Sequence, residues 1–202
     1  DQFCIGGTVG PFAGRLRRID ASNGQSAVLL HGDEAALHRV DWLLEHSNQS
    51  NVAIYTVSLR HGEGGLPGDR DFTVAYTLSD NSLMIDLTVS TTHDTPISLT
   101  NHAYFTLGAT SVSALSLQMN AQSVLLTDNE QCATGRSIPV AGTALDFARE
   151  RLLDDALMAF PDGLDHSYVL GSGRRDALAS DRAAALTNRA NGISLDIATT
   201  QP

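Results

Sequence analysis

A histidine stands at the centre of an alternating run in the stretch SLTNHAYFTLG, residues 98–108. Strand side chains point alternately to opposite faces, so a mostly apolar set beginning at Ile97 would share one face. His102 would share the other with Thr100 and Tyr104, each about 6.6–7 Å away along the strand. An imidazole can transfer a proton near neutral pH, and flanking hydroxyls can fix its tautomer or hold a polyol. The pattern therefore allows a catalytic His102, and a histidine hydrogen-bonded within a polar sheet face is the simpler alternative.

Further side chains with useful chemistry stand at predicted turns and strand ends. In GLDHSYVL, a glycine followed by an acid and then a strand places the Asp165 carboxylate at the mouth of that strand, although a turn-stabilising aspartate has the same pattern. In VGPFAGRLRRI, Gly14 allows a close backbone approach that could present Arg15 inward, with an exposed arginine as the simpler alternative. His31 follows the apolar run AVLL and precedes a glycine, so it also lies at a predicted strand end. The other histidines in polar surroundings are expected at the surface: His38, His46, His61 and His93.

The elements that must position these residues are mostly β-strands. Alternating patterns predict strands at residues 51–59, 115–119, 123–126, 167–170 and 193–198, and a hairpin from residues 72–78 and 83–89. Residues 149–160, RERLLDDALMAF, form the only reasonable helical stretch, and a proline follows it. Many short strands separated by turns predict an all-β fold, a large antiparallel sandwich that forms one domain over residues 1–202.

The composition restricts the classes of function. A formal net charge of −10 without a basic run argues against nucleic-acid binding. All 13 basic residues are arginine, which excludes Schiff-base or Walker-type lysine chemistry within these residues. Cys4 and Cys132 have no CxxC spacing, and the histidines lack metal-ligand spacing, so we predict no metal site and no disulfide framework. The absence of a long apolar run and of a secretory signal predicts a cytoplasmic protein that does not cross a membrane.

Five short motifs follow one another along the chain: VGPFAGRL, LLHG, GEGGLPGD, TNHAYFTLG and GLDHSYVL. They resemble VGxxANRI, LHGG, GEEGYPGN, TNHxYFNLxG and GxDHxF/YVL of the aldose 1-epimerases, or galactose mutarotases. The terminal TTQP resembles the start of that family's TTxPGVQFYTGN segment. The resemblance extends from about Thr8 to Pro202 and implies that family's antiparallel β-supersandwich.

The same resemblance implies an activity and a role for each matching residue. The activity is interconversion of the α and β anomers of a free hexose such as galactose or glucose, with neither metal nor organic cofactor. His102 matches the histidine regarded as the general acid that protonates the ring oxygen. Arg15, His31 and Asp165 match substrate-binding residues, and Tyr104 matches a position beside the acid. The implied ligand is a small monosaccharide, and the oligomeric state stays open.

The chain also departs from the family pattern. Gly14 replaces an asparagine, Asp33 replaces the second glycine of LHGG, and Thr106 replaces the asparagine of YFNL. The family's catalytic base is a glutamate beyond the TTQP position, so we expect a chain truncated at both ends and inactive by itself. Two alternatives stay open: a hexose-6-phosphate 1-epimerase, with Arg17 and Arg18 as phosphate ligands, and a non-catalytic carbohydrate-binding module.

Overall fold

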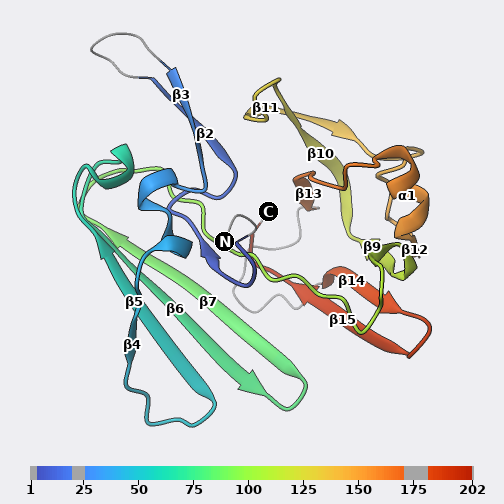
Figure 1. The fold of residues 1–202 in the computed structure, drawn as a ribbon, viewed down its shortest axis with the longest axis horizontal. Coiled ribbons are helices and arrows are strands. Elements are labelled where there is room, and N and C mark those ends of the chain that lie inside the picture. The colour runs from blue at the N-terminus through green and yellow to red at the C-terminus, as the bar shows by residue number, and fades with distance from the viewer. Residues whose placement is uncertain (1–3, 20–25, 171–181, 202) are drawn as a thin grey trace. The chain divides into compact units, whose positions relative to one another are not determined.

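The regular structure of the chain is mostly β-strand, with little helix, in a computed structural model that describes residues 4–19, 26–170 and 182–201. Its contacts divide it into two compact units, Asp1–Tyr104 and Phe105–Pro202, coloured from blue to red along the chain in Figure 1. All pairings between the described strands are antiparallel, and an isolated parallel bridge joins Phe12 to Ser98. The single domain over residues 1–202 stays a prediction.

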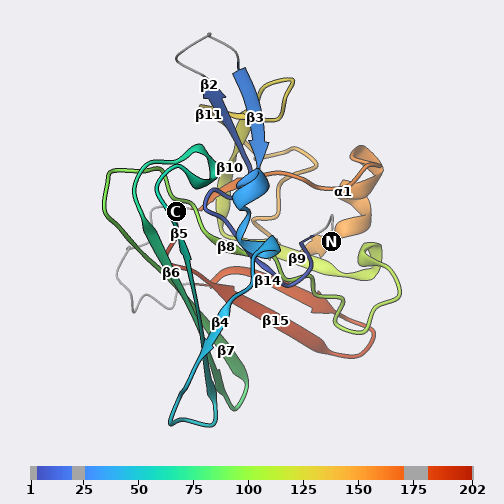
Figure 2. The same ribbon diagram turned by 60° about the vertical axis from the view of Figure 1, so that its left-hand side comes forward.

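The first unit contains a four-stranded sheet in the order β4-β5-β6-β7 and the two-stranded ribbons β2-β3 and β1-β8. Figure 2 shows the β2-β3 ribbon extending away from the larger sheet. The elements are β1 (Thr8–Val9), β2 (Arg15–Ile19), β3 (Ser26–Leu30), η1 (Asp33–Ala35), η2 (Leu37–Arg39), β4 (Leu43–Glu45), β5 (Val52–Leu59), η3 (Glu63–Gly65), β6 (Arg70–Ser79), β7 (Ser82–Thr91) and β8 (Thr100–Asn101), where η denotes a 3₁₀ turn.

The β6-β7 hairpin carries the core of this unit. The predicted hairpin is confirmed, with strands longer than expected, because pairing continues to Ser79 and Ser82 at the turn. Alternation places Phe72 and Val74 on one face, where each is 1% exposed. Phe72 packs in a buried cluster with Ala35, Leu37 and Leu59, which joins the sheet to the turns η1 and η2.

An apolar cavity of about 470 Å³ lies on the same sheet face. Tyr55 and Tyr76 line it from neighbouring strands, with their rings 6.1 Å apart at 82°. Trp42 lines it as well and is fixed because its Nε1 donates to the carbonyl of Leu37 at 2.8 Å. His38 borders the cavity, so this residue lies between the apolar interior and the polar groups described below.

The second unit contains the sheets β11-β10-β13 and β12-β9-β14-β15. Val124, Val140 and Leu145 form its buried cluster, against which Leu164 and Tyr168 pack. Its elements are η4 (Val112–Ala114), β9 (Ser116–Met119), β10 (Ala121–Thr127), β11 (Ala133–Pro139), β12 (Arg151–Leu152), α1 (Leu153–Ala159), β13 (Tyr168–Leu170), β14 (Arg182–Asn188) and β15 (Ile193–Ala198).

The predicted helix over residues 149–160 is only partly right. The helix α1 begins at Leu153, because Arg151 and Leu152 pair with Leu117 and Ser116 of β9. The backbone groups of Arg151 and Leu152 therefore pair with a sheet edge, although the local spacing of apolar residues predicted that they would be helical. Among the described helices, none is long and apolar enough to cross a membrane.

The continuous strand expected from residue 97 to residue 107 is wrong. The strand β8 covers only Thr100–Asn101, and the Asn101 side chain accepts the backbone N–H of Ala103 at 3.1 Å. This hydrogen bond satisfies the Ala103 N–H in place of a bond to a neighbouring strand. Leu107 and Gly108 then take left-handed conformations, with φ of 48° and 73°. The strand therefore ends where its alternating pattern continues.

We predict that Phe72→Ala lowers the free energy of unfolding by about 3–5 kcal/mol, because it leaves a cavity in the buried cluster. Leu83→Ala, at a residue of the same hairpin that is 54% exposed, should change it by no more than about 0.5 kcal/mol. Urea titration followed by circular dichroism measures both. Equal losses in the two variants would contradict this placement of the core.

Candidate active site

His31 is fixed where the β2-β3 ribbon meets the turn η1. Arg15, the first residue of β2, pairs with Leu30, the last residue of β3. Gly14 and His31, the residues just beyond these strand ends, therefore also face each other. The backbone N–H of His31 donates to the Gly14 carbonyl at 2.9 Å, and the N–H of Gly14 donates to His31 Nδ1 at 3.1 Å. His31 adopts a left-handed conformation with φ of 56°. Two hydrogen bonds to one residue therefore hold both its backbone and its ring.

The bond to Nδ1 determines which nitrogen of His31 carries a proton. A ring nitrogen that accepts from an N–H has no hydrogen of its own. The neutral imidazole must then carry its hydrogen on Nε2. His31 consequently offers a hydrogen-bond donor on the side of the ring away from Gly14.

His102 lies beside His31 at the end of the β1-β8 ribbon. Its N–H donates to the Gly7 carbonyl at 2.9 Å, and its carbonyl accepts from the N–H of Gly6 at 3.0 Å. Its ring centroid is 5.8 Å from that of His31, edge to face at 83°, and 5.1 Å from that of Tyr104 at 33°. His102 is partly buried, whereas Tyr104 is 58% exposed. The two imidazoles and the phenol therefore form one cluster of rings.

Close backbone packing brings these segments together. A Cβ added at Gly10 would lie 2.5 Å from Leu99 Cδ2 and 2.8 Å from Leu37 Cδ1. Gly32 has φ of 94°, and a Cβ there would lie 2.6 Å from the carbonyl oxygen of Gly10. Both positions need glycine, because an added methyl group would separate the segments that carry His31 and His102.

His38 belongs to the same cluster, and the expected surface position is wrong for it. Its ring lies 6.3 Å from that of His31, and its Cβ would be 3.2 Å from a Cβ at Gly7. Burial lowers the pKa of His38 below its ordinary value of 6.5, and the charges of Arg39 and His102 act in the same direction. The signal in the sequence was the small, apolar run Ala35-Ala36-Leu37 directly before it, which is buried.

Asp165 lies in the second unit, in the loop before β13, and is exposed. Its neighbours anchor it. Leu164 packs against the buried cluster, and the His166 ring lies 4.9 Å from that of Phe160 at 68°. With both flanking side chains packed inward, the Asp165 carboxylate is exposed to solvent, and its role as a substrate ligand stays a prediction.

Metal-ligating residue types do not combine into a metal-binding group in the described part of the chain. No group of three or more histidine, cysteine, aspartate or glutamate residues is placed there to hold a metal ion. Cys4 and Cys132 are both buried as free thiols.

The family model described as aldose 1-epimerase matches residues 1–202. The chain belongs to the aldose 1-epimerase family. Galactose mutarotase of Sus scrofa is 28% identical over 193 residues, covering 94% of this chain and 54% of that protein. Aldose 1-epimerase of Haemophilus influenzae is 28% identical over 218 residues, covering 99% of this chain and 62% of that protein.

Solved structures of the aldose 1-epimerase family confirm the antiparallel β fold. The GalM/aldose epimerase homologue of C. elegans superposes with a TM-score of 0.81 at 26% identity, covering 98% of this chain and 63% of that one. Galactose 1-epimerase of Lactobacillus acidophilus superposes with a TM-score of 0.76 at 28% identity, covering 93% and 59%. The chain therefore spans little more than half the length of the relatives it matches.

For His31, we predict that ¹⁵N NMR at neutral pH shows an unprotonated Nδ1 and a protonated Nε2. The physical reason is the Gly14 N–H, which leaves no room for a second hydrogen between the two nitrogens. A spectrum with the hydrogen on Nδ1 would contradict the bond that fixes the ring.

For His38, we predict that the folded protein loses stability as pH falls from 7. Its pKa is depressed in the folded state, so the unfolded state binds more protons once pH drops below about 6.5. The loss continues until pH passes the folded pKa, and His38→Gln should make the dependence shallower. Urea titrations at several pH values measure this, and an NMR titration midpoint of His38 at or above 6.5 would contradict it.

Proposed function

We propose that the protein containing this chain is an aldose 1-epimerase that interconverts the α and β anomers of free hexoses such as galactose or glucose. The observation that carries the proposal is the contact between the partly buried rings of His31 and His102, with the Tyr104 ring beside His102. Family membership supports the reaction class. Its location in the cytoplasm stays a prediction.

The reaction needs a proton donor at the ring oxygen and a base at the anomeric hydroxyl. In the proposed mechanism, His102 protonates the ring oxygen while the base removes the hydroxyl proton, and the bond between C1 and the ring oxygen breaks. Rotation about the C1–C2 bond presents the other face of the aldehyde. Reclosure reverses both proton transfers and yields the other anomer. The base is the family glutamate that the motif order assigns to a segment beyond TTQP.

A neutral His31 suits the work of His102. Two positive imidazoles with centroids 5.8 Å apart would repel, which would oppose protonation of His102. Because the Gly14 N–H donates to Nδ1, a neutral His31 carries its hydrogen on Nε2 and would donate it to a sugar hydroxyl. His31 would thereby orient the substrate without competing for the catalytic proton.

The remaining predicted residues supply complementary groups. The Arg15 guanidinium is a fixed donor, and the Asp165 carboxylate can accept from two neighbouring hydroxyls. Tyr104, tilted against the His102 ring, offers a hydroxyl and an apolar face. Donors and acceptors of this kind are what a polyol requires, and these roles rest on the family motifs.

We predict that His102→Gln lowers kcat for anomer exchange about 10²–10⁴-fold in a longer natural protein that contains residues 1–202, because the general acid is lost. Residues 1–202 alone should exchange anomers at the buffer rate. NMR of α- and β-galactose and glucose measures exchange, with His46→Gln, at an exposed position, as the control.

Other outcomes select other functions. Exchange by residues 1–202 alone would mean that a group in this chain serves as the base. Saturable sugar binding without exchange in the longer protein would indicate a carbohydrate-binding module. Competition by glucose 6-phosphate but not by galactose would indicate the hexose-6-phosphate branch.

A further inference from the structure

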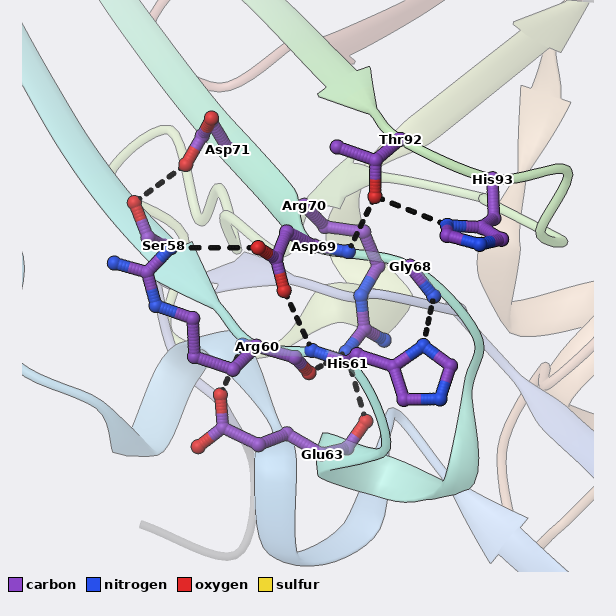
Figure 3. A network of polar contacts seen from close by, with 10 residues as sticks. All are labelled: Ser58, Arg60, His61, Glu63, Gly68, Asp69, Arg70, Asp71, Thr92 and His93. Atoms are coloured by element: carbon purple, nitrogen blue, oxygen red, sulfur yellow. Dashed lines mark hydrogen bonds and ion pairs between the residues drawn. The ribbon is translucent and has the colours of Figure 1, made fainter.

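The loop between β5 and β6 is organised around a buried arginine. Arg70, the first residue of β6, is 0% exposed. Its Nη2 donates to the carbonyl oxygens of Arg60 at 2.8 Å and Glu63 at 2.9 Å. Figure 3 shows the guanidinium pointing into the turn that these carbonyls form. One nitrogen thus joins Arg60, directly after β5, to Glu63, the first residue of η3.

Arg70 is anchored from the side of the core. Strand alternation places it on the face of Phe72, and it pairs with Leu59 of the buried cluster. Burial lowers the pKa of Arg70, and the carboxylates of Glu63 and Asp69 oppose that effect. A buried charge that lost its two carbonyl partners would be costly, so the conformations of the arginine and of the turn depend on each other.

Polar contacts close the rest of the loop, as Figure 3 shows. The His61 N–H donates to Asp69 Oδ1 at 2.8 Å, and the Gly68 N–H donates to His61 Nδ1 at 3.1 Å. The Glu63 carboxylate accepts the backbone N–H of Arg60. These contacts lie mostly at the exposed rim, whereas Arg70 holds the loop from inside.

The loop backbone rests directly on the turn that follows His31. A Cβ added at Gly64, which has φ of 63°, would lie 2.9 Å from Ala35 Cβ and 3.6 Å from the Gly32 carbonyl oxygen. Gly64 therefore touches η1, whose N-cap residue Gly32 directly follows His31. A Cβ at Gly65 would lie 1.9 Å from Arg18 Nη1, so the loop also touches a side chain of β2.

We propose that Arg70 is a positioning residue for His31. It holds the loop of residues 60–66 against the turn Gly32–Ala35. When this turn is held in position, it keeps the His31 ring hydrogen-bonded to the Gly14 N–H and beside His102. The structural part of the inference stands on these contacts alone, and its catalytic consequence rests on the proposed function.

Arg70→Met tests the inference in residues 1–202. NMR should show loss of the hydrogen-bond coupling between the Gly14 amide and His31 Nδ1, and loss of exchange protection at the Ala35 amide, which donates to the Gly32 carbonyl. Amides of the β6-β7 ladder report on global folding. Arg60→Met is the matched control, because its side chain is 72% exposed and pairs with the rim residue Asp69 at 3.7 Å.

A second pair of variants separates the loop contact from the arginine. Gly64→Ala should push the loop off Ala35 and reproduce both losses. Gly62→Ala, also at positive φ but with nothing within 4 Å of its added Cβ, should not. If Arg70→Met does not fold, Arg70→Lys, which keeps the charge but can reach fewer carbonyls, takes its place with the same measurements. A folded Arg70 variant or Gly64→Ala with an intact Gly14–His31 coupling would overturn the proposal.

The activity arm distinguishes this inference from the proposed function. In the longer natural protein, Arg70→Lys should lower kcat/KM for galactose by up to about 100-fold, the cost of a small displacement of a binding group. If the Arg70 variant loses the Gly14–His31 coupling but the longer wild-type protein shows no anomer exchange, the proposed function is refuted and the positioning role stays intact. Loss of activity with the coupling retained would overturn the positioning role.

Discussion

Two hydrogen bonds between Gly14 and His31 determine the geometry on which the proposed site depends. They involve the backbone N–H of His31 and its Nδ1. The position of Gly14 at the end of the β2-β3 ribbon therefore sets the orientation of the His31 ring and restricts its rotamers. A ring held before the ligand arrives has less conformational entropy to lose on binding. In the neutral imidazole, the same bond to Nδ1 leaves the hydrogen on Nε2.

Two departures from the family motifs lie at left-handed positions of the backbone. Gly14 stands where the family has asparagine and has φ of 81°, and Asp33 stands where the family has glycine and has φ of 52°. Glycine, asparagine and aspartate are the residues that enter the left-handed region most readily, so each residue suits the conformation it takes. Gly14 lacks an amide side chain, and its backbone N–H donates to His31.

The hydrophobic core and the polar site meet through a short series of contacts. Phe72 belongs to the buried cluster, Arg70 follows it on the same strand face, and the arginine holds the loop that touches η1. Apolar burial is not directional, whereas guanidinium–carbonyl bonds are. Through Arg70, the non-directional packing of the core is thereby connected to a histidine ring that needs one orientation.

The sequence by itself determined the antiparallel strands, the β6-β7 hairpin and the family, because alternation and motif order are local properties that a strand or loop keeps in any context. It also identified His31, His102 and Asp165 as candidates by residue type and position. Only the tertiary structure decided that the strand ends at Asn101, that the first turn of the expected helix pairs with β9, and that His38 is partly buried. Each of these outcomes depends on a partner distant in sequence, such as Gly7 for His38. A backbone group forms its hydrogen bond with a partner that tertiary packing brings close to it. The periodicity of apolar residues in the sequence does not specify that partner.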